Sequence, residues 1–298
     1  MEMKIDMILD SDVFNEVDDQ FAISYMVKNQ DRLNIIGITI APFSPIHNKR
    51  VSDVSSSIDK SYDEAIKVLD FLKEDKLKTK VFKGSRRFLN NEEDCVDSEA
   101  VIFIINESKR YTKDNRLTIV AIGAITNIAS AINKDNTIVD RIRLVWLGGS
   151  HYEYHKNREF NMYQDIAAAR VAMLNAYDAT YLPCQGVVSQ FLTNKYELEH
   201  FLKGKNELCD YLLKNVIYWK EERVNNYLPT WSKVLWDVCA IAYLLNDDER
   251  FMLVKERKLK IPSYDGQTYE KEVDRIIKYV YEIKRDELFF DLFNKITN

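Results

Sequence analysis

Apolar residues along the chain follow two alternating periods. Nearly continuous apolar runs, which are typical of buried strands, occur at 4–9, 33–40, 81–82, 117–122, 144–147 and 181–183. Between these runs, apolar residues recur at helical spacing over 18–28, 61–73, 98–109 and 165–174. Strand runs that alternate with helical ones predict an α/β fold with an open, mostly parallel, twisted sheet and helices on both faces.

The last third of the chain shows a different pattern. Helical spacing dominates there, at 206–222, 237–245 and 273–284, and strand candidates are few. No low-complexity linker, internal repeat or break in composition divides the 298 residues. We therefore expect residues 1–298 to form a single α/β domain whose helical C-terminal portion packs over the sheet.

Composition and charge narrow the class of protein. The chain has 42 basic and 47 acidic residues, a net charge of −5, and no basic cluster with interleaved aromatics, so we expect no nucleic-acid partner. No apolar stretch is long enough to span a bilayer, and the N-terminus lacks the pattern of a signal peptide. The four cysteines form no CxxC pair. These features predict a cytoplasmic protein that acts on a small molecule.

The first predicted strand runs directly into an acidic loop. Five carboxylates are crowded there, namely Asp10, Asp12, Glu16, Asp18 and Asp19. Loops at the carboxyl ends of parallel strands bind ligands in open α/β sheets. Without a basic partner these acids would repel one another, unless a cation lies among them, and hard oxygen ligands favour Ca²⁺ or Mg²⁺. A solvated acidic loop is the alternative, but surface acids usually spread along helices.

Three further polar loops are expected at the same edge of the sheet. They carry Gly-Ala-Ile-Thr-Asn-Ile-Ala at 123–129, Leu-Gly-Gly at 147–149 followed by Glu-Phe-Asn at 159–161, and Trp-Asp at 236–237. Taken alone, Thr126 marks a helix start and Asp237 is a helix N-cap. Only their combination with the acidic loop favours a ligand site.

Together these residues resemble the inosine-uridine-type nucleoside hydrolases, which are metal-dependent N-ribohydrolases. The family signature is Asp-x-Asp followed shortly by Asp-Asp. This chain is similar to the subgroup in which Asn-Glu-x precedes Asp-Asp-Gln, as in residues 15–20. The two acidic pairs lie two residues further apart than in the commonest form. Matches continue through Trp-Leu-Gly-Gly and Trp-Asp-Val-Cys-Ala, so the resemblance covers roughly residues 4–245.

The resemblance implies a Ca²⁺ site. Asp12 would be a calcium ligand and the general base for the attacking water, and Asp19 a bidentate ligand. Thr126 would give its main-chain carbonyl, and Asp237 the remaining carboxylate. The family's members are commonly dimers or tetramers, which implies a homo-oligomer here.

The resemblance also implies a ribose site. Its residues would be Asp10, Asp18, Asn48, Glu159 and Asn161. Asn161 would be catalytic together with Asp12, and Asp10 and Asp18 would hold the ribose hydroxyls or the water on the metal. The assignment of Asn48 rests on a loop, 42–50, that matches the family poorly in length.

The expected reaction is hydrolysis of a ribonucleoside to free base and ribose. Its transition state is an oxocarbenium-like ribosyl cation, which needs an activated water, acceptors around the sugar and neutralisation of the departing base. Trp236 stands where pyrimidine-accepting members commonly have histidine. Indole can stack on a purine but donates no useful proton, which favours purine nucleosides, although such a tryptophan can also be simple packing.

Two other functions fit parts of the sequence. An apolar run followed by Asp10-x-Asp12 also resembles the aspartyl-phosphate phosphatases, which use Mg²⁺, but no later acidic pair follows a strand. A non-catalytic ribonucleoside-binding homologue is the third interpretation. His151 and His155 lie near the expected pocket but lack metal-ligand spacing.

Overall fold

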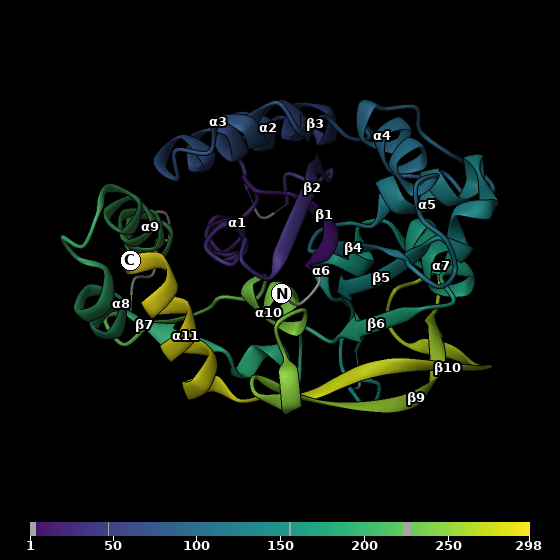
Figure 1. Ribbon diagram of the computed structural model, residues 1–298. Helices are drawn as coiled ribbons and strands as arrows, with labels where there is room; N and C mark the ends of the chain where they lie inside the picture. The colour runs from purple at the N-terminus through teal and green to yellow at the C-terminus, as the bar shows by residue number, and fades with distance from the viewer. Residues whose placement is uncertain (1–3, 47, 155, 223–227) are drawn as a thin grey trace.

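The computed structural model describes residues 4–46, 48–154, 156–222 and 228–298. An eight-stranded sheet in the order β3-β2-β1-β4-β5-β6-β10-β9 runs through its centre (Figure 1). Its strands are β1 (Ile5–Ser11), β2 (Leu33–Ile40), β3 (Val81–Phe82), β4 (Leu117–Ala121), β5 (Ile142–Leu147), β6 (Ala179–Leu182), β9 (Met252–Pro262) and β10 (Tyr269–Ile283). Every neighbouring pair is parallel except β9 and β10.

The remaining elements are helices and one small two-stranded sheet. The antiparallel pair consists of β7 (Leu192–Asn194) and β8 (Ser232–Val234). The α-helices are α1 (Asp19–Val27), α2 (Val54–Phe71), α3 (Asp75–Lys78), α4 (Glu99–Ser108), α5 (Thr126–Lys134), α6 (Phe160–Tyr163), α7 (Ile166–Asn175), α8 (Lys195–Leu202), α9 (Glu207–Ile217), α10 (Val238–Tyr243) and α11 (Arg285–Thr297). Short helical turns are η1 (Asn136–Asp140), η2 (Val188–Gln190), η3 (Tyr218–Glu222) and η4 (Asp247–Glu249).

Both faces of the sheet are covered, as the sequence predicts. In β1, Met7 and Leu9 join the apolar cluster that includes α1, α2 and α8–α11, whereas Ile8 joins the cluster with α4, α5 and α7. Successive side chains of a strand point to opposite faces, so a strand buried on both sides is a nearly continuous apolar run. Within the described residues, no helix is both long and apolar enough to cross a membrane.

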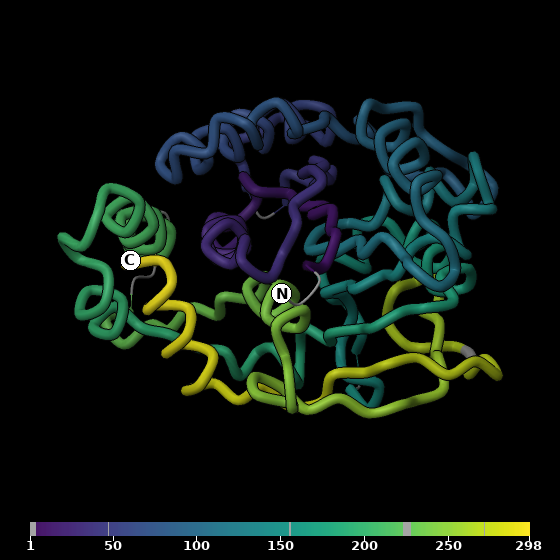
Figure 2. The backbone as a smooth tube through the Cα atoms, viewed as in Figure 1, coloured from purple at the N-terminus to yellow at the C-terminus, as the bar shows by residue number. Residues whose placement is uncertain are grey.

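The order of the strands places the ligand site. From β1 the chain proceeds outward through β2 and β3, and then returns to build β4, β5 and β6 on the other side. The reversal lies between β1 and β4, and open α/β sheets bind ligands beyond the carboxyl ends of the strands at such a point. Figure 2 shows α10, from the last third of the chain, beside the N-terminal segment that contains α1.

The prediction of a helix at 273–284 is wrong, because this segment lies in the long strand β10. β10 pairs with β9 as an antiparallel hairpin and with β6 in parallel. Its register shifts between Val273 and Ile276 and again between Val280 and Glu282. Each shift interrupts the two-residue alternation, so the apolar residues mimic helical spacing. The C-terminal third is therefore helical only in part.

Helix α2 begins earlier than its apolar pattern suggests. Asp53 accepts a hydrogen bond from the Ser56 amide at 2.7 Å, and the Ser56 side chain accepts from the amide of Asp53, which forms a capping box. The first two turns are rich in serine, so the apolar stripe becomes visible only further along the helix. The cap, rather than the stripe, determines where the helix begins.

Candidate active site

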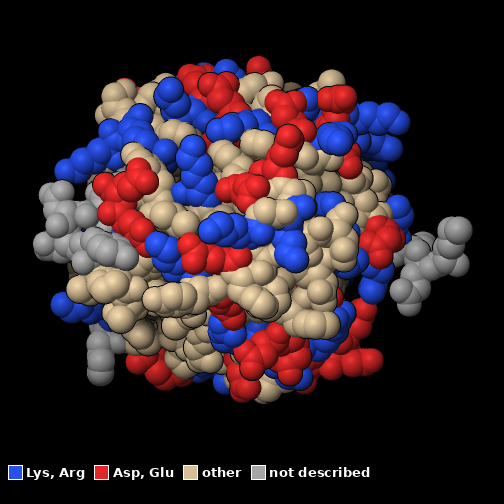
Figure 3. All heavy atoms as spheres, turned by 90° about the vertical axis from the view of Figure 1, so that its left-hand side faces the viewer, with Lys and Arg blue, Asp and Glu red and all other residues tan. Residues whose placement is uncertain are grey.

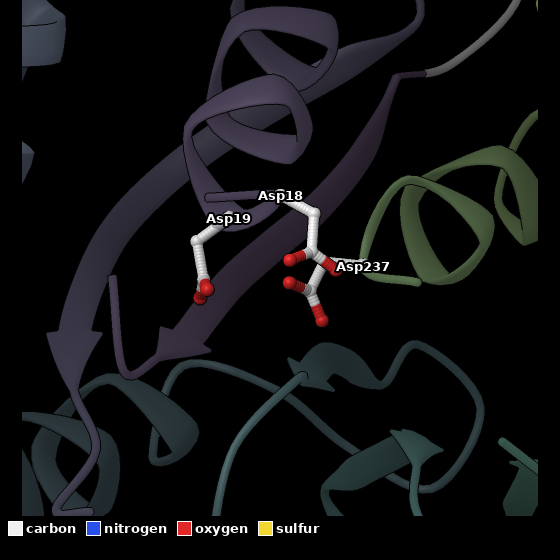
Figure 4. Close-up of side chains that lie close together, drawn as sticks. All are labelled: Asp18, Asp19 and Asp237. Carbon is white, nitrogen blue, oxygen red and sulfur yellow. The ribbon is translucent and has the colours of Figure 1, made fainter. Parts of the chain in front are cut away.

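Three carboxylates converge where β1 ends. Asp18 and Asp19 lie at the start of α1 and Asp237 directly precedes α10, and one oxygen of each lies within 4.8 Å of the others (Figure 4). All three side chains are buried. Burial, followed by the charge of Asp18, raises the pKa of Asp19 to about 7, and the same causes raise the pKa of Asp237 well above its usual value.

Asp12 completes this acidic cluster. It is 2% exposed, and its Oδ2 atom has no hydrogen-bond partner among the described residues. Burial raises the pKa of Asp12 well above its usual value, and the charge of Asp19 adds to the effect. A buried carboxylate oxygen without a partner is unfavourable, and a cation would supply the missing interaction.

A buried lysine on the other side of the acidic loop was not foreseen. Nζ of Lys233, on β8, lies 2.7 Å from Oε2 of Glu16 and 3.0 Å from Oδ1 of Asp18. The expectation that the loop lacks a basic partner is therefore wrong for these two acids. Lysine and carboxylates lie far apart in the sequence, so no local spacing indicated the contact. The only signal was a lysine in a mostly apolar stretch, Trp-Ser-Lys-Val-Leu-Trp at 231–236.

A cavity of about 320 Å³ opens in front of the acids. The predicted site residues that line it are Asp12, Asp18, Asp19, Glu159, Asn161, Trp236 and Asp237. Sequence reasoning missed several other lining residues, among them Asn15, Ile122, Arg158 and Cys184. The segments that follow β1, β4 and β5 thus meet at one cavity, as their positions after parallel strands predict, and the segment after the antiparallel strand β8 joins them.

Glu159 and Asn161 are held firmly at the edge of this cavity. Glu159 caps α6, and its carboxylate accepts hydrogen bonds from the amides of Gly149, Asn161 and Met162 at 2.7 to 3.0 Å. Nδ2 of Asn161 donates to the carbonyls of Ile122 and Leu147, both at 3.0 Å. The Asn161 amide therefore links the ends of β4 and β5.

Asp10 supports the site from behind and does not line the cavity. Its Oδ1 atom accepts from Oγ1 of Thr39 at 2.6 Å and from Nδ2 of Asn127 at 2.8 Å. Burial raises the pKa of Asp10 to about 7, although both hydrogen bonds lower it. Asp10 thus joins β1 to β2 and to α5.

Asn48 and Thr126 are also absent from the cavity lining. Nδ2 of Asn48 donates to the carbonyls of Phe14 and Asn15, so this residue holds the acidic loop. Oγ1 of Thr126 donates to Asp165 at 2.6 Å. Ile122, at the end of β4, lines the cavity instead, and its carbonyl faces the Asn161 amide.

Of the two histidines near the expected pocket, His151 is absent from its lining. Nδ1 of His151 lies 2.8 Å from Oε2 of Glu153, and the ring packs edge-on against Tyr279. His155 lies outside the described residues. Among the described residues, no histidine lines the cavity.

The donor set fits a hard divalent cation. Asp18, Asp19 and Asp237 present oxygens close enough to share one ion, and Asp12 has an unpartnered oxygen beside them. Carboxylates and carbonyls suit Ca²⁺ or Mg²⁺, whereas no described cysteine or histidine joins this cluster to favour a softer metal. Burial and the neighbouring carboxylates raise the pKa values of Asp12, Asp19 and Asp237, and a bound cation would lower them.

The family model described as inosine-uridine preferring nucleoside hydrolase matches residues 7–289 of the chain. The inosine-uridine preferring nucleoside hydrolase of Crithidia fasciculata is 25% identical over 155 residues, which are 51% of this chain and 48% of that protein. The matched stretch thus spans about half the length of this curated relative.

Solved structures share the fold across nearly the whole chain. A plant nucleoside hydrolase has a TM-score of 0.77 at 16% identity over 99% of both chains. A purine-preferring ribonucleoside hydrolase from Gardnerella vaginalis has a TM-score of 0.75 at 21% identity over 98% of both. At these low identities the structural matches show a common fold. The match of the family model over residues 7–289 shows that the sequences are related as well. The chain belongs to the family of inosine-uridine preferring nucleoside hydrolases.

Proposed function

We propose that the protein hydrolyses the N-glycosidic bond of ribonucleosides with the help of Ca²⁺, releasing free base and ribose. The observation that carries this proposal is the unpartnered, buried oxygen of Asp12 beside three convergent carboxylates, all of which line one cavity in a nucleoside hydrolase fold. When bound, the cation would chelate vicinal hydroxyls of the ribose and lower the pKa of a water.

The carboxylates take different roles in this proposal. Asp12, Asp19 and Asp237 hold the cation, and Asp12 accepts the proton of the attacking water. A main-chain carbonyl after β4 completes the protein ligands. The sequence predicts that of Thr126, but Ile122 lines the cavity and Thr126 does not, so we assign the carbonyl to Ile122.

The ribose is positioned by the remaining polar residues of the cavity. Asp18 accepts a hydrogen bond from a ribose hydroxyl, and Asn161 presents its side chain from the edge between β4 and β5. Glu159 already accepts three main-chain hydrogen bonds, so its main contribution is to fix the loop that carries Asn161. These fixed acceptors favour a sugar that becomes positively charged.

A purine is the base that the cavity suits best. Trp236 lines the cavity next to Asp237, and its indole offers a face for stacking. Among the described lining residues no histidine is present to protonate the leaving base. Stacking is worth more for the larger ring system, so we propose a preference for purine nucleosides.

The test is hydrolysis of a panel of purine and pyrimidine nucleosides by metal-stripped protein, with and without added Ca²⁺. We expect base release only with the cation, and Asp12→Asn should lower kcat by about a thousandfold, as loss of a general base does. Equal turnover in the presence of a chelator would overturn the cation's role. Release of no base from any nucleoside would overturn the proposed reaction.

The structure gives no support to a phosphatase mechanism. That chemistry needs a nucleophilic aspartate that reaches the substrate. Asp10, the first acid of the loop, lies outside the cavity lining, and its Oδ1 atom accepts two hydrogen bonds.

The single domain, the dimeric or tetrameric assembly and the cytoplasmic location remain predictions. On the face shown in Figure 3, the drawn basic and acidic side chains are interspersed, without a continuous basic stripe.

A further inference from the structure

The acids of the loop divide into two groups according to their partners. Glu16 and Asp18 contact the ammonium of Lys233, at 2.7 Å and 3.0 Å. Asp12, Asp19 and Asp237 have no ion pair with any described lysine or arginine. Asp19 accepts a hydrogen bond from Ser11 at 2.6 Å and shares another with the Asp237 side chain. The ammonium of Lys233 therefore pairs with Glu16 and Asp18 and not with the other three acids.

Lys233 is fixed in this position. Its residue is 5% exposed, and Nζ also donates to the carbonyl of Val234 at 2.7 Å. An ammonium has three donors, and all three are used. A buried charge held by three acceptors has little freedom to move, so the carboxylate of Asp18 is oriented by it.

Orientation matters here because Asp18 is a possible ligand by distance alone. One of its oxygens lies within 4.8 Å of oxygens of Asp19 and Asp237. If Asp18 bound a divalent ion, the ion would gain a further carboxylate and the ribose would lose an acceptor. Nζ of Lys233 lies 3.0 Å from Oδ1 of Asp18, so its charge competes with the ion for this carboxylate.

We propose that Lys233 is a positioning residue, which keeps Asp18 out of the cation's ligand set and directed at the substrate. This inference rests on the proposed function, because it assumes the cation at Asp12, Asp19 and Asp237. It also gives a role to the longer segment between Asp12 and Asp18, because Glu16 lies in this segment and forms the second ion pair of Lys233.

The test measures Ca²⁺ binding to the full-length, metal-stripped protein by titration calorimetry. In Lys233→Met, Asp18 is released to join the ion, so we expect Ca²⁺ to bind about five- to tenfold more tightly. The KM for inosine should rise about tenfold at saturating Ca²⁺. A lysine that only supports the fold would give the opposite result, with Ca²⁺ binding and substrate binding weakened together.

A double-mutant cycle identifies Asp18 as the mediator. Asp18→Asn alone should change the Ca²⁺ affinity less than about threefold, and it should abolish the gain caused by Lys233→Met. A gain that persists in the double variant would mean a general charge effect and would overturn the proposal. Lys220→Met is the matched control, because Lys220 is near Lys233 yet stacks on Trp231 without contacting Asp18. It should leave both constants unchanged.

Two further outcomes are separable. If Lys233→Met does not fold, Lys233→Arg keeps the charge, and the proposal then requires a Ca²⁺ affinity within about twofold of the natural protein. Weakened Ca²⁺ binding in Lys233→Arg would overturn it. A natural protein that binds Ca²⁺ but hydrolyses no nucleoside would overturn the proposed function while the calorimetric cycle still decides the role of Lys233.

Discussion

Gly123, at the end of β4, lies so close to Asp12 that a Cβ atom on it would come within 2.9 Å of Oδ1 of that carboxylate. The same Cβ would lie 3.1 Å from Cβ of Ala41, so it could not shift away freely. Gly123→Ala should therefore displace Asp12. We expect kcat/KM for inosine to fall about a hundredfold, the usual cost of moving a catalytic group by about 1 Å.

The thermal midpoint separates displacement from unfolding in this variant. Gly123 does not have a positive φ, so alanine adopts its backbone conformation without strain, and the midpoint should fall by only a few degrees. Unchanged kcat/KM in a folded Gly123→Ala protein would show that Asp12 is not constrained by β4.

Asn161 offers a second prediction, because its Nδ2 atom satisfies two buried carbonyls. Asn161→Ala leaves both unpaired, which should lower the free energy of unfolding by about 2 to 4 kcal/mol in urea titrations and raise the KM for the nucleoside. Asn133→Ala is the matched control. Asn133 also donates to two carbonyls, at 2.8 and 2.9 Å, but in an exposed position. Equal losses in the two variants would contradict this explanation.

Trp236 should determine the choice of base. With Trp236→His, stacking weakens and a proton donor is gained, so the ratio of kcat/KM for inosine to that for uridine should fall about tenfold. Trp236→Phe keeps an aromatic face and adds no donor, and it should retain most of the purine preference. If the ratio for Trp236→His matches that of the natural protein, the indole only packs.

The stability of the metal-free protein should depend on pH. Burial raises the pKa of Asp10 and of Asp19 from 3.8 to about 7, so the folded chain binds more protons than the unfolded chain between these values. The free energy of unfolding then falls as pH rises through this window. In calorimetry with a chelator, we expect a melting temperature several degrees lower at about pH 8 than at about pH 5.5.

Added Ca²⁺ should reduce that difference, because a cation stabilises the ionised acids of the cluster and binds only the folded chain. The increase in melting temperature on adding Ca²⁺ should accordingly be larger at the higher pH. A metal-free protein that melts at the same temperature at both pH values would contradict the assignment of these acids.

The sequence alone predicts the sheet's first half well. β2 and β3 begin and end where the apolar runs do, at Leu33–Ile40 and Val81–Phe82. Most residues of these two strands are buried, and Asn34 is the exposed one, so each apolar run coincides with its strand. The segments after β1, β4 and β5 meet at one cavity, as the sequence predicts, and Trp236 and Asp237 join them from the segment after β8.

What the sequence could not show depends on long-range contacts and on broken periods. Lys233 reaches Asp18 only because β8 packs behind the acidic loop, and nothing local indicates that pairing. β10 was mistaken for a helix because its register shifts disturb the alternation. Asn48 and Thr126 are predicted site residues that do not line the cavity. Their side chains donate hydrogen bonds to Asn15 and Asp165 instead.

The proposed cation ligands join the beginning of the chain, with Asp12 and Asp19, to its last third, with Asp237. During synthesis the ribosome releases the N-terminal acids long before α10, and a growing chain therefore carries them without their partner. The complete cation site that we propose arises only when the final segments dock. Calcium would then stabilise finished molecules and not the unfinished ones, which makes ion binding a mark of completed folding.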